Sequence, residues 1–241
     1  MKNQKKIKNK SFFFLISFLF LTNLISIKTL KKVDIHDIKI IGSELFSQND
    51  VINNSSLKFP IRLIFVKTNF LEKELKQNLS LKYVSVSRQL IPFGLKVQIR
   101  TRKPIAYGEK ILGDEKIFGF IDIDGVFINK ENAEGKNLTN LTIQVFGWRE
   151  KFREILSKIL ISQKNNKFEV VKITFSPNGF LTIEEKHLKT IYLGFNPNLI
   201  NYQLQIINNL KSELKKNNFS EKIDSIDLTD PNKPKIKVFK P

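Results

Sequence analysis

Hydrophobic and polar positions divide the chain into one uninterrupted apolar run followed by segments with helical or strand periodicity. The apolar run covers residues 11–27 (SFFFLISFLFLTNLISI) and contains no charged residue. At about 1.5 Å per residue, a helix of this length extends roughly 25 Å, close to the ~30 Å hydrocarbon core of a bilayer. Lys10 and Lys28 flank the run, and their long side chains can reach the head-group region. We therefore predict a transmembrane helix within residues 11–30.

The residues around this run predict its orientation. Lysines are frequent in residues 1–10, where no acid occurs, and Lys28, Lys31 and Lys32 follow the run. Because basic residues favour the cytoplasmic side, residues 1–10 are predicted to be a cytoplasmic tail. The alternative is a cleaved signal peptide, but residues 23–28 (NLISIK) lack the small residues at alternating positions that are typical of a cleavage site. We predict a single-pass protein of the inner (plasma) membrane with most of the chain outside the cytoplasm.

The region after the apolar run has the pattern of a small α+β domain. Residues 34–41 (DIHDIKII) predict a short strand, and Ser47 is a candidate N-cap for a helix over residues 48–53. Asn69 and Glu72 resemble a capping box at the start of a second helix. The apolar stripe of that helix consists of Leu71, Leu75 and Leu79.

Two strands follow the second predicted helix. Apolar and polar residues alternate over residues 83–90 and again over residues 95–100, and residues 91–94 (IPFG) separate the two runs. Residues 33–103 therefore predict the order β-α-α-β-β. One sheet covered by two helices on one face is a stable arrangement for a domain of this size.

The remainder of the chain, residues 104–241, begins with a hairpin signal. The Asp-Gly pair at 124–125 lies between alternating apolar residues, a combination typical of a tight turn. The motif D-x-D-G also occurs in calcium-binding EF-hand loops. Counted from Asp122, however, the twelfth position is Ala133 instead of the glutamate that such a loop requires. We predict a turn and no metal site.

Two amphipathic helices are predicted in the same region. The first has apolar residues at helical spacing, namely Phe152, Ile155, Leu156, Ile159 and Leu160. The second begins at Asn196-Pro197 and is predicted to bury Leu199, Tyr202, Ile206, Leu210 and Leu214. Short strands are predicted over residues 141–146, 168–175, 180–184, 190–193, 223–229 and 235–239. The fold class is therefore α+β, with a mixed β domain that contains two helices.

Several segments resemble the FtsQ/DivIB family of bacterial cell-division proteins. The β-α-α-β-β order directly after a single span resembles a POTRA module. Residues 38–42 (IKIIG), residues 88–92 (RQLIP) and residues 100–106 (RTRKPIA) are similar to the family pattern, which has an E/R-R-x-P-x-A junction between its domains. The resemblance implies a POTRA-like domain over residues 33–103 and an FtsQ-type β domain over residues 104–241.

No arrangement of residues in the sequence indicates catalysis. Cysteine is absent, and the two histidines are predicted in the first strand (His36) and in a turn (His187), without metal-ligand spacing. Nucleophile and phosphate-loop motifs are also absent. The acid pairs Asp122/Asp124 and Glu184/Glu185 are predicted at strand ends and turns, where carboxylates are usually solvated. We predict no enzyme activity, no cofactor, no metal and no small-molecule substrate.

The formal charge of +18 raises the alternative of a membrane-tethered nucleic-acid binder. A nucleic-acid binder usually concentrates its basic residues on one stripe, whereas the lysines here are spread along the whole chain. We therefore predict no nucleic-acid partner. A weak attraction to anionic lipid or cell-wall polymer is a more modest use of the same charge.

The resemblance implies a non-enzymatic divisome scaffold that regulates septum-forming membrane proteins from the extracytoplasmic side. FtsQ-like proteins bind FtsB/FtsL-type partners through the final strands of the β domain, and an exposed sheet edge can accept a partner strand. Lysines on such a strand also prevent unwanted pairing, so both interpretations stay open. A POTRA-bearing envelope transport or assembly component is the alternative function. The candidate partner-binding residues are Ile226, Asp227, Leu228, Thr229, Lys235, Ile236, Lys237, Val238 and Phe239.

Overall fold

The computed structural model describes residues 13–20, 22, 31–113, 115–133, 138–166, 169–216 and 223–239. Residues 13–20 are helical with exposed side chains, and the other residues of the predicted tail and span, apart from the helical residue 22, lie outside the described residues. Among the helices that the structure describes, none is long and apolar enough to cross a membrane. The chain divides into two compact units, Met1–Thr101 and Arg102–Pro241.

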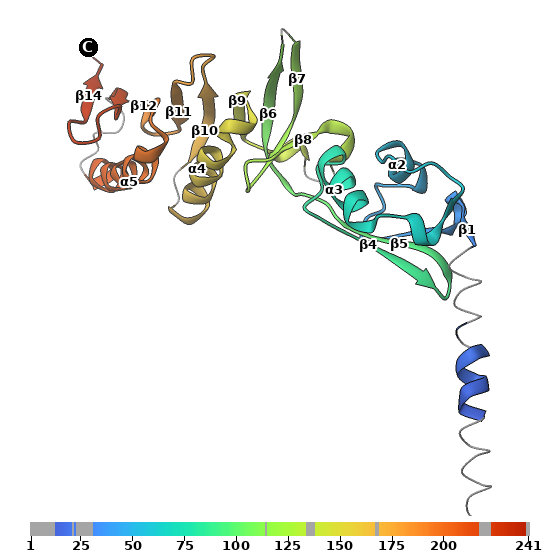
Figure 1. Cartoon of the computed structure of the whole chain (residues 1–241). Coiled ribbons are helices and arrows are strands. Elements are labelled where there is room, and N and C mark those ends of the chain that lie inside the picture. The colour runs from blue at the N-terminus through green and yellow to red at the C-terminus, as the bar shows by residue number, and fades with distance from the viewer. Residues whose placement is uncertain are drawn as a thin grey trace, which may run out of the picture. The chain divides into compact units, whose positions relative to one another are not determined.

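The first unit contains a three-stranded sheet with two helices on one face (Figure 1). The sheet order is β2-β5-β4, with β2 parallel and β4 antiparallel to β5. This arrangement confirms the predicted β-α-α-β-β order, to which a two-stranded pair, β1 with β3, is added. The elements are β1 (Lys32–Val33), η1 (Ile35–Asp37), β2 (Ile38–Ile41), α2 (Gln48–Asn53), β3 (Ile61–Arg62), η2 (Leu63–Phe65), α3 (Thr68–Asn78), β4 (Tyr83–Leu90) and β5 (Phe93–Arg100).

The core of this unit forms between α3 and the sheet. The predicted leucine stripe of α3 is buried, and alternate residues of β5 are buried in the same cluster. Ser47 caps α2 as predicted, since its hydroxyl accepts from the backbone N–H of Asp50 and the Asp50 carboxylate accepts from the N–H of Ser47. The buried residues that α3 and β5 contribute are Leu71, Leu75, Leu79, Leu95, Val97 and Ile99.

Two local predictions in this unit are wrong. Asn69 is not an N-cap, because α3 begins at Thr68 and has no side-chain cap. The Glu72 carboxylate accepts instead from the N–H of Val86 in β4, at 2.7 Å. His36 lies in the 3-10 helix η1 rather than in a strand, because Asp34 and Asp37 form a capping box around that turn.

The second unit is built on a nine-stranded sheet with the order β14-β13-β12-β11-β10-β9-β6-β7-β8. Neighbouring strands are antiparallel except for the parallel pairs β6/β9, β9/β10 and β12/β13. The elements are β6 (Pro104–Leu112), β7 (Glu115–Asp122), β8 (Phe127–Asn129), η3 (Lys130–Asn132), η4 (Leu138–Asn140), β9 (Ile143–Trp148), η5 (Glu150–Phe152), α4 (Arg153–Asn166), β10 (Val170–Phe175), β11 (Leu181–Glu185), β12 (Lys189–Gly194), η6 (Pro197–Leu199), α5 (Ile200–Lys216), β13 (Ile223–Asp227) and β14 (Lys235–Val238).

The two helices of this unit are crossover connections. Parallel neighbours cannot be joined by a tight turn, so α4 connects β9 to β10 and α5 connects β12 to β13. Both helices lie on the same side of the sheet (Figure 1), and the main core forms between them and the strands. The mixed α+β class with a large sheet and few helices is thus confirmed.

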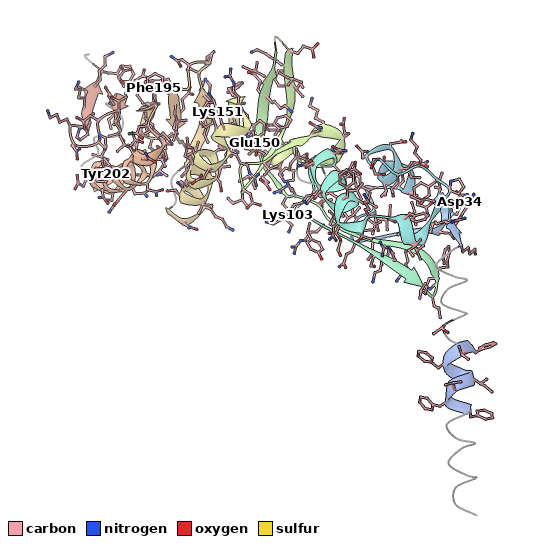
Figure 2. All side chains as sticks on the ribbon, in the orientation of Figure 1. Asp34, Lys103, Glu150, Lys151, Phe195 and Tyr202 are labelled. Carbon is pink, nitrogen blue, oxygen red and sulfur yellow. The ribbon has the colours of Figure 1, made fainter. Side chains whose placement is uncertain are left out.

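The predicted buried stripe of α5 is wrong by part of a turn. The buried positions are Ile200, Gln203, Leu204 and Ile207. Tyr202 was predicted to be buried, but it is 47 % exposed and projects from the surface of α5 (Figure 2). Leu199, Ile206 and Leu210 are half-buried, and the side chain of Leu214 lies outside the described residues. Ile206 and Leu210 pack against the core, so the prediction is confirmed in part for these two residues.

Candidate functional site

The last strand, β14, is at one end of the nine-stranded sheet (Figure 1). It pairs antiparallel with β13 and places Lys235 opposite Asp227 and Ile236 opposite Ile226. Within the part of the chain that the structure describes, no strand pairs with the outer edge of β14. Alternate backbone N–H and C=O groups of β14 therefore face outward without a strand partner.

Strand β13 is an interior strand, because β12 pairs with one side of it and β14 with the other. The side chains of Ile226 and Leu228 are fully buried in the core. These two candidate residues thus support the edge from within and do not present their side chains at the surface. Asp227 is half-buried and Thr229 is exposed, so the candidate residues do not form one continuous surface.

All residues of β14 are exposed, although the strand has one polar and one apolar face. Directly opposite residues of an antiparallel pair point to the same face, so Ile236 lies on the core side with Ile226. Val238 lies opposite Ile223 on the same side. The exposed fractions of Ile236 (43 %) and Val238 (46 %) show that these side chains are left only partly covered. Phe239, directly after the strand, is also exposed.

The connection between β13 and β14 is held by short polar contacts. The Asp227 carboxylate accepts from the N–H of Thr229 at 2.9 Å and from its hydroxyl at 2.7 Å. The hydrogen bonds from Thr229 hold the pKa of Asp227 below its ordinary value, with a further contribution from Lys235. Lys237 forms an ion pair with Asp224 at 3.0 Å. These contacts fix β14 in its register and leave its other edge open.

A buried glutamine of α5 forms hydrogen bonds at the ends of the two strands that precede β14 in the sheet. The Nε2 atom of Gln203 donates to the carbonyl oxygens of Leu193 and Leu228, both at 2.7 Å. Leu193 belongs to β12 and Leu228 directly follows β13, so one side chain joins two parallel strands to their crossover helix. A glutamine in a helix is usually predicted to face solvent. Its hydrogen bonds to two buried carbonyls could therefore not be predicted from the sequence pattern.

The acids predicted to be solvated are in part buried structural groups. Asp122 is 2 % exposed, and its carboxylate accepts from Arg102 and from the N–H of Val126. Arg102 also donates to Asp124 at 3.1 Å. The Asp-Gly turn itself is confirmed, since the N–H of Gly125 donates to the carbonyl of Asp122. This cluster holds the start of β6 to the β7–β8 turn.

Glu185 is the second acid that the prediction placed in solvent. Its side chain is fully buried and accepts from Lys211 of α5 at 2.8 Å and from the N–H groups of His187 and Leu188. Burial by itself would raise the pKa of Glu185, but these hydrogen bonds together lower it below its ordinary value. His187 lies in a turn as predicted, 3.9 Å from Glu169. Among the described residues, no group of three or more potential ligands could hold a metal ion.

The comparison with known families found a match within the first unit. A family model described as "POTRA domain, FtsQ-type" matches residues 33–102. Residues 33–102 are thus similar to FtsQ-type POTRA domains. The match is consistent with a protein of the FtsQ/DivIB cell-division family. No curated protein matches the chain significantly.

Proposed function

We propose that this protein is a non-enzymatic divisome scaffold of the inner membrane. A single span within residues 11–30 would anchor it, with the N-terminus in the cytoplasm and both folded units outside. The FtsQ-type POTRA domain and the uncharged run before it support this arrangement. The same match favours cell division over the alternative of an envelope transport component.

The open edge of β14 is the observation that carries the proposal. An incoming strand would pair with the outward backbone groups, and its apolar side chains would cover Ile236 and Val238. Phe239, directly after the strand, offers a further exposed apolar side chain. Lys235 and Lys237 lie on the opposite face of the strand. Lys237 is already paired with Asp224, so Lys235 is the lysine that would interact first with an acid of the partner. We propose FtsB/FtsL-type division proteins as the partners. The FtsQ-type POTRA domain would contact other divisome components, and the assembly would regulate septum synthesis.

The same edge could instead be protected from pairing by its lysines. Capture of partners by the full-length, membrane-embedded protein separates the two interpretations. Reversal of both charges (Lys235→Glu with Lys237→Glu) should abolish capture of the division partners if the edge is a docking site. Reversal of the exposed Lys151 and Lys164 changes the net charge equally and should leave capture intact.

Proline substitution tests the backbone requirement directly. Alternate N–H groups of a strand point to opposite sides, so only one of Ile236→Pro and Lys237→Pro removes an outward donor. One variant should therefore lose partner capture while Trp148 fluorescence shows an intact second unit. A fluorescent fusion of the full chain should concentrate at the septum. Diffuse envelope fluorescence, or capture unaffected by all four changes in β14, would overturn the proposal.

A further inference from the structure

The sheet of the POTRA domain has a second face that neither α2 nor α3 covers (Figure 1). Side chains alternate along β5, so Leu95, Val97 and Ile99 point to the helices and the intervening residues point away. The strand register places residues of β2 and β4 beside them. We call this surface the open face and define it by Lys39, Tyr83, Ser85, Lys96, Gln98 and Arg100.

In the part of the chain that the structure describes, the basic residues of the open face form no ion pairs with acids that would stabilise the fold. Lys39 and Lys96 are direct register partners in β2 and β5, and like charges in opposite positions are unfavourable. Arg100 lies over the ring of Tyr83, 5.7 Å from its centroid. None of the ion pairs found in the described part of the chain includes Lys39, Lys96 or Arg100. Adjacent cations without an ion-pair partner create a positive local potential that attracts anions.

Most acids of this unit are held elsewhere by hydrogen bonds from the backbone and are not paired with the cations of the open face. Each accepts a hydrogen bond from a backbone N–H group in a cap, a loop or a strand edge. These acids are Asp34, Asp37, Asp50, Glu72 and Glu74. The face therefore combines three cations with the serine hydroxyl of Ser85 and the amide of Gln98, groups that donate hydrogen bonds to phosphate oxygens.

We propose that the open face binds the phosphate groups of anionic phospholipids at the extracytoplasmic surface of the inner membrane. This inference rests on the membrane anchor of the proposed function. Only residues 28–31 separate the uncharged run from β1, and an extended segment of four residues covers about 14 Å. The lipid head groups are thus the nearest polyanionic surface, and a sheet face with three spread cations suits a planar array of phosphates better than a single small ion.

A fluorescent probe at the open face tests this docking. The chain contains no cysteine, so Ser85→Cys introduces one labelling site, and Gln77→Cys on α3 supplies a matched site on the helical side. The full chain, labelled with an environment-sensitive dye, is placed in nanodiscs of phosphatidylcholine with or without phosphatidylglycerol. We expect a blue shift and protection from iodide quenching only at position 85 and only with phosphatidylglycerol. The response should weaken in 0.5 M salt, where screening is stronger.

Charge reversal identifies the groups that bind. A basic residue near an anionic surface contributes about fivefold in affinity, so Lys96→Glu should lower the docked fraction several-fold. The triple reversal of Lys39, Lys96 and Arg100 should abolish the response, whereas reversal of three exposed lysines outside the open face should preserve it. The control lysines are Lys67, Lys73 and Lys76.

Each negative result has a distinct meaning. Failure of the full chain to enter nanodiscs contradicts the anchor, and hence the proposed function. Entry without a probe response at position 85 overturns the docking of the open face alone. An equal response to the two lipid compositions also overturns it, because the binding would not depend on phosphate charge. A response to an oligonucleotide but not to phosphatidylglycerol would assign the face to nucleic acid instead.

Discussion

The side-chain nitrogen of Gln203 lies 2.7 Å from the carbonyl oxygen of Leu228, and this contact ties the strand beside the candidate docking edge to helix α5. The same nitrogen is equally close to the carbonyl of Leu193, so two buried acceptors depend on one donor. A buried carbonyl without a partner costs free energy that folding must offset. Gln203 thus contributes both to the stability of this end of the sheet and to the position of the strand β13, which carries the candidate docking strand β14.

We expect Gln203→Leu to destabilise the second unit by about 2–3 kcal/mol, because two buried carbonyls lose their donor. Trp148 is the only tryptophan of the chain and is buried in this unit, so its fluorescence in urea reports the unfolding. Tyr202→Ala, at the adjacent exposed position, should cost well below 1 kcal/mol. Equal effects of the two changes would show that the hydrogen bonds of Gln203 contribute little.

Gly119→Ala should lower the stability of the second unit by about 2 kcal/mol or more. Gly108 and Gly119 are paired across β6 and β7, and the ring of Phe127 packs on this site. A Cβ on Gly119 would lie 2.4 Å from the carbonyl oxygen of Ile128 and 2.6 Å from the Phe127 ring. The melting temperature measures the loss, and Leu112→Ala at an exposed position of the same hairpin is the control.

Arg102→Met should cost about 3 kcal/mol, because Asp122 would remain buried without its cationic partner. The double variant with Asp122→Asn should recover part of this loss, since the uncompensated charge is then removed. Arg153→Met provides a control at an ion pair with exposed partners. Recovery of stability in the double variant, measured by urea unfolding, distinguishes a charge effect from lost packing.

Glu185 makes the stability of the second unit dependent on pH. Its pKa is lower in the folded state than the ordinary value of 4.5, so its contribution is fully present above that value. The contribution is lost as the pH falls below about 4 towards the folded pKa. Glu185→Gln should therefore destabilise the unit by about 2 kcal/mol at pH 7 and by clearly less at pH 3.5. Glu184→Gln, at the half-exposed neighbouring position, is the control and should cost well below 1 kcal/mol at pH 7.

Periodicity was sufficient to predict elements whose apolar stripe decides their position. The leucines of α3 and the alternation in β5 are buried as expected, because burial of apolar surface dominates there. In α5, periodicity predicted a face that is only partly correct, because Tyr202 and Ile206 define one apolar stripe and Ile200 and Leu204 define another. The face that is buried in the core also includes Gln203. A polar residue that satisfies backbone carbonyls cannot be distinguished from a surface residue by pattern alone.

The long hairpin strand β6 was also missed, because Glu109 and Lys110 interrupt its apolar alternation. In the structure Glu109 is nearly buried and forms an ion pair with Lys116 across the hairpin. The position of β14 at the end of the sheet agrees with the expected edge. The burial of Ile226 and Leu228 could not be predicted, because β13 and β14 have similar compositions and the sequence does not show which of them is interior. The order of the strands depends on the two crossover helices, and the local sequence pattern of a strand does not show which strand lies beside it.

The position of β14 in the chain has a consequence for the timing of assembly. This strand follows every other strand of its sheet in the sequence. Among the described residues it pairs with β13 alone, and β13 is placed by the α5 crossover. During synthesis the edge can form only after the preceding strands and α5 have emerged and packed. A nascent or truncated chain would therefore lack the candidate docking strand, and any partner that requires this strand would join only molecules whose second unit is complete.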